Sequence, residues 1–192
     1  MRVIAGEAKG RRLVAPKGLG TRPTADRVRE TLFAIVAPRI AGAAVLDLFA
    51  GSGAVGIEAL SRGAARAVFV ERDRAAVAAL RTNLARLGLE PRARVIARDA
   101  QAALRDLARA GARFELVFLD PPYASDLALR TLAALGRGEH LAASALVIVQ
   151  HRAKAELPEA QGLLRRVRVR RFGETALTFF APVEYTPPDS RP

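Results

Sequence analysis

Residues 43–56, AAVLDLFAGSGAVG, decide the fold of this chain. The first eight form a short apolar run that ends at a glycine-rich turn, which predicts a buried strand. Residues 51–56 match the G-x-G-x-x-G pattern, and residues 54–61 have the composition of a helix ended by Gly63. A strand, a glycine turn and a helix in this order predict a site for an adenosine-containing ligand. The motif alone fits a nicotinamide enzyme as well as any other adenosine-binding protein.

Strand and helix signals alternate through the rest of the body. Apolar runs predict strands at residues 67–71, 93–97, 116–119 and 145–150. Helical patterns, several ended by glycine, predict helices at residues 74–87, 100–110 and 126–135. This alternation predicts an α/β fold with a mostly parallel sheet and helices on both faces.

The end of the chain breaks this rhythm. Residues 164–172 alternate apolar side chains with arginine, and a Gly-Glu pair separates them from a second apolar run at 176–181. This pattern predicts an antiparallel hairpin. With Val167 and Val169 directed inward, the other face carries Arg166, Arg168 and Arg170. These arginines either keep an edge strand soluble or contact RNA.

The composition favours a polyanionic partner. The chain has 192 residues with a formal net charge of +12, and 28 of its basic residues are arginine. An excess of this size is typical of proteins that bind nucleic acid. The absence of cysteine excludes disulfides, Cys-ligated metals and thiol catalysis, and two histidines argue against a His-rich metal site, so no metal is expected. With no signal peptide or membrane span in the sequence, the cytoplasm is the expected location.

Half of the charge excess lies in the first fifth of the chain. Residues 1–39 carry nine Lys and Arg and three acids, in a stretch rich in Gly, Pro and Thr that predicts turns and a short hairpin. A helix is then expected from Thr24 or Asp26 to near Pro38. This segment is either a solvated basic face or an arm that binds phosphates. We favour the arm because the charge is concentrated in a short stretch of the chain.

Polar residues follow consecutive predicted strands. Gly51, Glu71, Asp99 and Asp120 each fall at or just after a strand end, and Asp120 begins the sequence Asp-Pro-Pro-Tyr. The ligand crevice of an open parallel sheet lies at the carboxyl ends of its strands, so these residues are expected at one edge. Glu71 is placed to accept both hydroxyls of a ribose.

Asp47 lies inside the first strand, three residues before the glycine turn. A carboxylate there would suit the cationic sulfonium and ammonium end of S-adenosylmethionine better than a pyrophosphate. The alternative is a buried aspartate that caps the amides of the turn. Asp99 has a similar alternative as a helix N-cap, and one residue can serve both purposes.

The motifs D-x-F-x-G-S-G (47–53) and D-P-P-Y (120–123) resemble the signature of amino-methyltransferases that use S-adenosylmethionine. The likeness extends to the RsmD family, bacterial 16S rRNA guanine-N2 methyltransferases of the small subunit. The stretches that carry it are residues 2–13, 21–33, 46–64, 69–73 and 119–123, which cover most of the first 125 residues.

The resemblance implies a Rossmann-like class I methyltransferase fold. Residues 1–40 would form a small basic RNA-binding arm with a hairpin and a helix, residues 41–185 the methyltransferase domain with its C-terminal hairpin, and residues 186–192 a flexible tail. The cofactor would be S-adenosyl-L-methionine. The residues expected to bind it are Asp47, Ala50, Gly51, Ser52, Gly53, Glu71, Asp99 and Ala100.

The expected reaction methylates the exocyclic N2 of one guanine in 16S rRNA, within the small ribosomal subunit or an assembly intermediate, and a monomer is the favoured state of the enzyme. Asp120 and the carbonyl of Pro121 would hold the amine, Pro122 would stiffen the motif, and Tyr123 would stack on the base. A DNA adenine-N6 methyltransferase is the alternative, since it shares the D-P-P-Y motif. The residues expected to bind the RNA are Arg11, Arg12, Arg22, Thr24, Arg27 and Arg29.

Overall fold

The computed structural model describes residues 1–15, 23–122 and 126–183, without the side chains of residues 23–25. Within these residues, eight strands form one sheet in the order β3-β2-β1-β4-β5-β8-β7-β6. The first five strands in this order are parallel to one another, β8 is antiparallel to β5, and β7 and β6 continue the sheet in antiparallel pairs. The strands are β1 (Ala44–Leu48), β2 (Arg66–Val70), β3 (Ala93–Ile96), β4 (Phe114–Leu119), β5 (Leu141–Arg152), β6 (Ala160–Gln161), β7 (Leu164–Phe172) and β8 (Thr175–Pro182).

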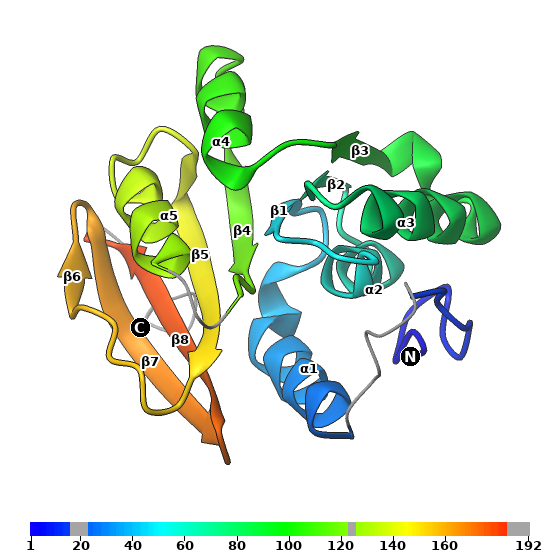
Figure 1. The fold of residues 1–192 in the computed structure, drawn as a ribbon, viewed down its shortest axis with the longest axis horizontal. Helices are drawn as coiled ribbons and strands as arrows, with labels where there is room; N and C mark the ends of the chain where they lie inside the picture. Colours follow the sequence, from blue (N-terminus) through cyan, green and yellow to red (C-terminus); the bar gives the residue numbers. More distant parts are fainter. Residues whose placement is uncertain (16–22, 123–125, 184–192) are drawn as a thin grey trace, which may run out of the picture.

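Helices cover both faces of the sheet, which confirms the predicted α/β architecture (Figure 1). One face carries α1 (Pro23–Val36), α2 (Ala54–Ser61) and α3 (Arg74–Leu87), and the other carries α4 (Ala100–Arg109) and α5 (Leu127–Leu135). Two 3-10 turns, η1 (Ala37–Arg39) and η2 (Glu90–Arg92), complete the described elements. None of the helices in the described ranges combines the length and the apolar composition needed to cross a bilayer.

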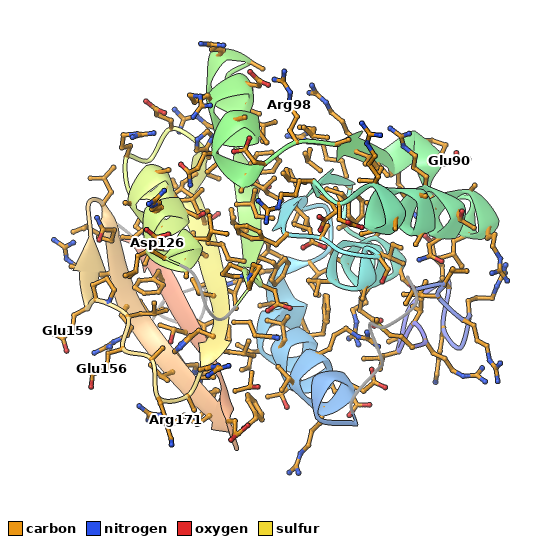
Figure 2. The ribbon with its side chains drawn as sticks, viewed as in Figure 1. Glu90, Arg98, Asp126, Glu156, Glu159 and Arg171 are labelled. Atoms are coloured by element: carbon orange, nitrogen blue, oxygen red, sulfur yellow. The ribbon has the colours of Figure 1, made fainter. Side chains whose placement is uncertain are left out.

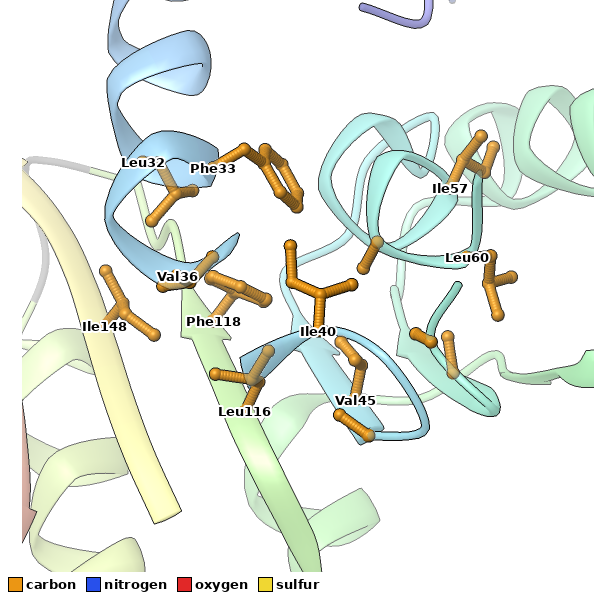
Figure 3. Packing of buried hydrophobic residues seen from close by; sticks show 14 of the residues in the cluster. Leu32, Phe33, Val36, Ile40, Val45, Ile57, Leu60, Leu116, Phe118 and Ile148 are labelled. Carbon is orange, nitrogen blue, oxygen red and sulfur yellow. The ribbon is translucent and has the colours of Figure 1, made fainter. Parts of the chain in front are cut away.

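The core has two parts, one on each side of the sheet. On the α1 side, Leu32, Phe33 and Val36 pack against β4 and β5, as Figure 3 shows. The ring centroids of Phe33 and Phe118 lie 6.1 Å apart. This packing joins α1 to the sheet in one core and leaves the carboxyl ends of the strands free for a site.

The strand order reverses between β1 and β4. From β1 the chain moves outward to β2 and β3, and it then crosses to β4 on the other side of β1. The last residues of these two strands, Leu48 and Leu119, are paired in register. The loops that follow β1 and β4 therefore leave from neighbouring points and diverge, which is where open parallel sheets bind ligands.

The C-terminal hairpin is confirmed, but one detail of its prediction is wrong. The register between β7 and β8 shifts between Arg166 and Arg168, so Val167 is an extra residue in a bulge. Its side chain is 49% exposed instead of facing inward with Val169. A bulge reverses the alternation of side chains along a strand, so Arg168 and Arg170 lie on the opposite face from Arg166.

The N-terminal segment is tied to the body of the protein. Arg2 and Arg12 form an antiparallel bridge, as a short hairpin requires. The fully buried carboxylate of Glu58 in α2 accepts hydrogen bonds from the amides of Ile4 (2.7 Å) and Ala5 (2.9 Å). Burial of a charged side chain is costly unless it is well bonded, so these contacts stabilise one position of the segment against α2.

Candidate active site

A cavity of about 560 Å³ lies at the carboxyl ends of the parallel strands. Its walls are mostly apolar, with a few polar groups that converge on it, as is typical of cofactor sites. The structure brings together at this cavity seven of the residues proposed from sequence: Gly51, Glu71, Asp99, Ala100, Asp120, Pro121 and Pro122. Among the described residues, no group of three His, Cys, Asp or Glu side chains is arranged to hold a metal ion.

Glu71 connects the end of β2 to the glycine loop. One carboxylate oxygen accepts the amide hydrogen of Gly51 at 2.8 Å, and the other accepts those of Arg72 and Asp73, each at 2.8 Å. A carboxylate has about four lone-pair positions, so these three bonds leave capacity for a ligand hydroxyl. These hydrogen bonds therefore fix the position of the glycine loop relative to Glu71, the proposed ribose acceptor.

The conformation of the glycine loop explains its sequence. Phe49, Gly51 and Gly53 all have φ angles in the left-handed region, at 65°, 55° and 86°. Phe49 lines the cavity in this sparsely populated conformation, which non-glycine residues keep mainly at functional sites. A Cβ atom on Gly53 would lie 2.3 Å from Leu80, and one on Gly56 would lie 2.3 Å from the Phe69 ring. Two of the glycines thus allow close packing, and this packing positions α2 behind the loop.

Ala50, Ser52 and Gly53 are in the loop but do not line the cavity. Ser52 is buried, and its carbonyl accepts a hydrogen bond from the Asn83 side chain at 3.0 Å. Contacts of these three residues with a cofactor remain predictions.

Asp47 is buried beneath the loop and does not line the cavity. Its Oδ2 accepts the amide hydrogen of Gly56 at 2.9 Å, the bond that the turn-capping interpretation predicts. Burial raises the pKa of Asp47 to about 7; the Gly56 amide opposes this rise, and the negative charges of Asp120 and Glu71 add to it. Its contact with a cofactor stays a prediction.

Asp99 is the N-cap of α4, since its Oδ1 accepts the amide hydrogen of Ala102 at 3.0 Å. The N-cap interpretation is confirmed. Asp99 and Ala100 also line the cavity, so both are placed where a cofactor could be contacted.

Asp120 immediately follows β4 and has a surface open to the cavity. Its carboxyl group is nevertheless surrounded by protein atoms, and this desolvation raises its pKa to about 6. A hydrogen bond from the side chain of Gln150, at the corresponding point of the adjacent strand β5, acts in the opposite direction. At neutral pH the group is therefore mostly a carboxylate, held in place by a neighbouring amide.

The residues at the cavity that the sequence analysis did not propose for the site are Phe49, Val70, Arg72, Asp73, Ala76, Arg98, Gln101, Leu127 and Gln150. Gln150 had a usable signal, because it stands at the end of a predicted strand in the same way as Glu71 and Asp120. The left-handed conformation of Phe49 has no such signal. Tyr123 lies outside the described residues.

The predicted RNA-binding arginines have different environments. Arg12 and Arg27 are exposed, and Arg11, also exposed, donates a hydrogen bond to the Arg86 carbonyl at 2.9 Å. Arg29 is only 6% exposed, and its guanidinium bonds to the Arg2 carbonyl at 2.7 Å and pairs with Asp26 at 3.3 Å. Arg29 thus lies inside the protein, unlike the surface position expected for it. Arg22 and the Thr24 side chain are outside the described part.

Comparisons with known proteins agree with this geometry. Residues 1–181 match the family model described as Conserved hypothetical protein 95. The chain is 45% identical over 158 residues to ribosomal RNA small subunit methyltransferase D of Escherichia coli K12, which covers 82% of this chain and 78% of that protein. The chain belongs to the family of ribosomal RNA small subunit methyltransferase D. The enzyme of that name from Haemophilus influenzae is 37% identical over 150 residues, 78% of each chain.

Solved structures of relatives share the whole fold of this family member. The Escherichia coli protein yhhF matches with a TM-score of 0.83 and 41% identity over 95% of this chain and 97% of that one. A hypothetical protein of Thermus thermophilus matches with a TM-score of 0.81 and 37% identity over 95% and 99%. The fold is that of class I methyltransferases, with the predicted mostly parallel sheet and C-terminal antiparallel hairpin.

Proposed function

We propose that this protein transfers a methyl group from S-adenosylmethionine to the exocyclic N2 of a guanine in the 16S rRNA of the small ribosomal subunit. The observation that carries the proposal is a single cavity with Gly51 and Glu71 on one part of its wall and Asp120 and Pro121 on another. The first pair suits an adenosine, and the second suits an amino group. Similarity to small-subunit rRNA methyltransferases supports rRNA as the substrate.

The residues at the cavity fit S-adenosylmethionine. Glu71 retains acceptor capacity for the ribose hydroxyls. Asp99 and Ala100 line the same cavity and would contact the adenine amine. The three carboxylates of Glu71, Asp99 and Asp120 also suit a ligand that carries positive charge. The cofactor, when bound, supplies a methyl group on a sulfonium centre, which is the reactive part of the chemistry.

The amine of guanine is a poor nucleophile because its lone pair is delocalised into the ring. Asp120 and the carbonyl of Pro121 can each accept a hydrogen bond from one N–H group of the amine. These two bonds favour a more tetrahedral amine nitrogen, aimed at the methyl group. Positioning of this kind contributes to catalysis by reducing the entropy that must be lost in the transition state. When the nitrogen gains a methyl group it loses one proton, and the Asp120 carboxylate can accept that proton and pass it to water.

The two prolines after Asp120 limit how the backbone of the motif can move. The Pro121 ring restricts its φ to near −65°, and Pro122 after it restricts the ψ of Pro121 to the extended region, so the direction of the Pro121 carbonyl is largely set by the chain itself. Pro121 is buried and Pro122 is exposed beside the cavity. Stacking of Tyr123 on the target base, after the base leaves its stack, completes the proposed site.

Nucleoside mass spectrometry tests the proposal. Small ribosomal subunits that lack the modification are incubated with the protein and labelled S-adenosylmethionine, and we expect labelled N2-methylguanine in the 16S rRNA. Asp120→Ala should lose at least a hundredfold in transfer rate, consistent with the contribution of a positioned catalytic group. It should still bind both RNA and S-adenosylmethionine. A parallel incubation replaces the subunits with DNA, and label found only in that DNA as N6-methyladenine would refute the proposal and support the alternative DNA enzyme.

A further inference from the structure

The arginines of β7 are divided between the two faces of the sheet. Arg168 is paired in register with Phe179, and Arg170 with Leu177. Phe179 and Leu177 both belong to the buried cluster on the α1 side of the sheet. Because paired residues of antiparallel strands point to the same face, Arg168 and Arg170 lie on the face that carries α1.

Arg170 is linked to Asp120 through paired residues on the two strands that lie between them. Arg170 pairs with Leu177, and Leu177 pairs with Gln150 on β5. Gln150 in turn hydrogen-bonds Asp120 on the next strand. Neighbouring strands are about 4.8 Å apart, so the Cα of Arg170 lies about 10 Å from that of Gln150 and about 14 Å from that of Asp120.

The two arginines are available for a partner. Both are exposed, and neither has a hydrogen bond or an ion pair with the described residues. Two other arginines of the strand are engaged: Arg165 bonds to the Gly162 carbonyl at 2.9 Å, and Arg166 pairs with Glu159 at 2.8 Å. Arg171 is exposed, on the opposite face from Arg170. A basic side chain that only kept an edge strand soluble would not need to be on this face.

The bulge at Val167 is what places them there. Without the extra residue, strict alternation after Arg166 would direct Arg168 and Arg170 to the α5 side. The bulge instead exposes an apolar side chain, with Val167 49% exposed, and turns both arginines to the α1 face, in line with Leu177 and the cavity residue Gln150. Bulges are known to redirect side chains next to functional sites.

We propose that Arg168 and Arg170 bind phosphates of the RNA strand beside the target nucleotide. The inference rests on the proposed function, since it names a contact of the same substrate. A strand whose base reaches Asp120 would pass its neighbouring phosphates along the exposed arginines of β7, beside the buried Leu177 and Phe179 of β8. Helix α1, with the exposed Arg27, lies beside the hairpin on this face, so the RNA would be held from two sides (Figure 1). The planar guanidinium matches a phosphate in charge and geometry.

The pairing of β7 with β8 provides a matched control, because it divides the arginines of β7 between the two faces of the sheet. Arg168→Ala/Arg170→Ala removes two charges from the α1 face, and Arg166→Ala/Arg171→Ala removes two from the α5 face of the same strand. Fluorescence anisotropy with labelled 16S rRNA fragments is measured over a salt series, together with S-adenosylmethionine affinity and thermal unfolding. We expect the first variant to bind RNA roughly tenfold more weakly at 0.1 M salt, with a log–log salt slope smaller by about 1.4, as for two single-strand phosphate contacts. Figure 2 shows Arg171 at the end of β7.

The control variant should keep wild-type RNA affinity, and both variants should keep their cofactor affinity. The first variant should keep its unfolding temperature, and the control, which loses the Arg166–Glu159 ion pair, should lose at most about 4 °C. Equal losses in the two variants, or no loss in the first, would overturn the inference. These results are distinct from failure of the proposed function, which would appear as wild-type protein that forms no N2-methylguanine in rRNA.

Discussion

Asp47 has a carboxyl group in surroundings that disfavour its charge. It is buried, and its pKa is raised to about 7. Between about pH 4 and pH 7 the folded protein therefore keeps a proton that the unfolded chain has released. Stability linked to this group is present at low pH and is lost as pH rises through 7.

The substitution Asp47→Asn tests this linkage. Asparagine can still accept the Gly56 amide hydrogen but carries no charge at any pH. We expect the free energy of unfolding to fall less between pH 5 and pH 8 than in the wild type, by a few kcal/mol. Urea unfolding at the two pH values measures the difference, and an equal fall in both proteins would contradict the assignment.

Asp47→Asn also tests whether Asp47 contributes to cofactor binding. If Asp47 attracts the cationic end of S-adenosylmethionine, calorimetry should show a weaker affinity for the variant at pH 8. Unchanged affinity would leave Asp47 with the turn-capping contact that the structure shows and would withdraw its proposed cofactor role.

At the scale of elements, the packing of α2 on β2 depends on the absence of a side chain at Gly56. A Cβ atom there would lie 2.3 Å from the Phe69 ring, well inside contact distance. Gly56→Ala should therefore destabilise the protein by about 1–3 kcal/mol, as overpacking of a filled core usually does. Thermal unfolding measures this loss.

A second substitution separates overpacking from other causes. Phe69→Leu alone leaves space at the same contact, and the Gly56→Ala/Phe69→Leu double variant should be more stable than the sum of the two single losses predicts. Additive losses would show that the close approach of helix and strand does not account for this glycine.

At the scale of the whole molecule, the net charge of +12 is unevenly distributed, and the N-terminal segment carries much of it. The triple substitution of Arg11, Arg12 and Arg27 by alanine should weaken RNA binding and reduce the log–log salt slope by about 2, since each single-strand phosphate contact contributes about 0.7. Anisotropy over a salt series measures both. A control variant with the same charge change replaces Arg105, Arg109 and Arg130, which are exposed on α4 and α5. An equal effect in the control would show that total charge alone determines RNA affinity.

The sequence by itself determined the alternation of strands and helices. Its turns are marked by glycine and proline, and the periodicity of apolar residues follows from local geometry. Residues 54–61 and 74–87 were predicted as helices with the bounds that α2 and α3 have. The edge of the sheet that holds the cavity was also predictable, because parallel strands must present their carboxyl ends together.

Only the tertiary structure determined which of these residues are buried, to which side of the sheet their side chains point and which residues they contact. Strict alternation cannot show that Val167 forms a bulge, because the bulge depends on how β7 pairs with β8. Charge alone cannot show that Arg29 is buried, since its partners, Asp26 and the Arg2 carbonyl, come together only when α1 and the N-terminal segment pack. The contact between Gln150 and Asp120 likewise requires strands 30 residues apart to be neighbours. Local sequence specifies the elements through backbone preferences, whereas burial, register and pairing depend on contacts between distant segments that exist only in the folded chain.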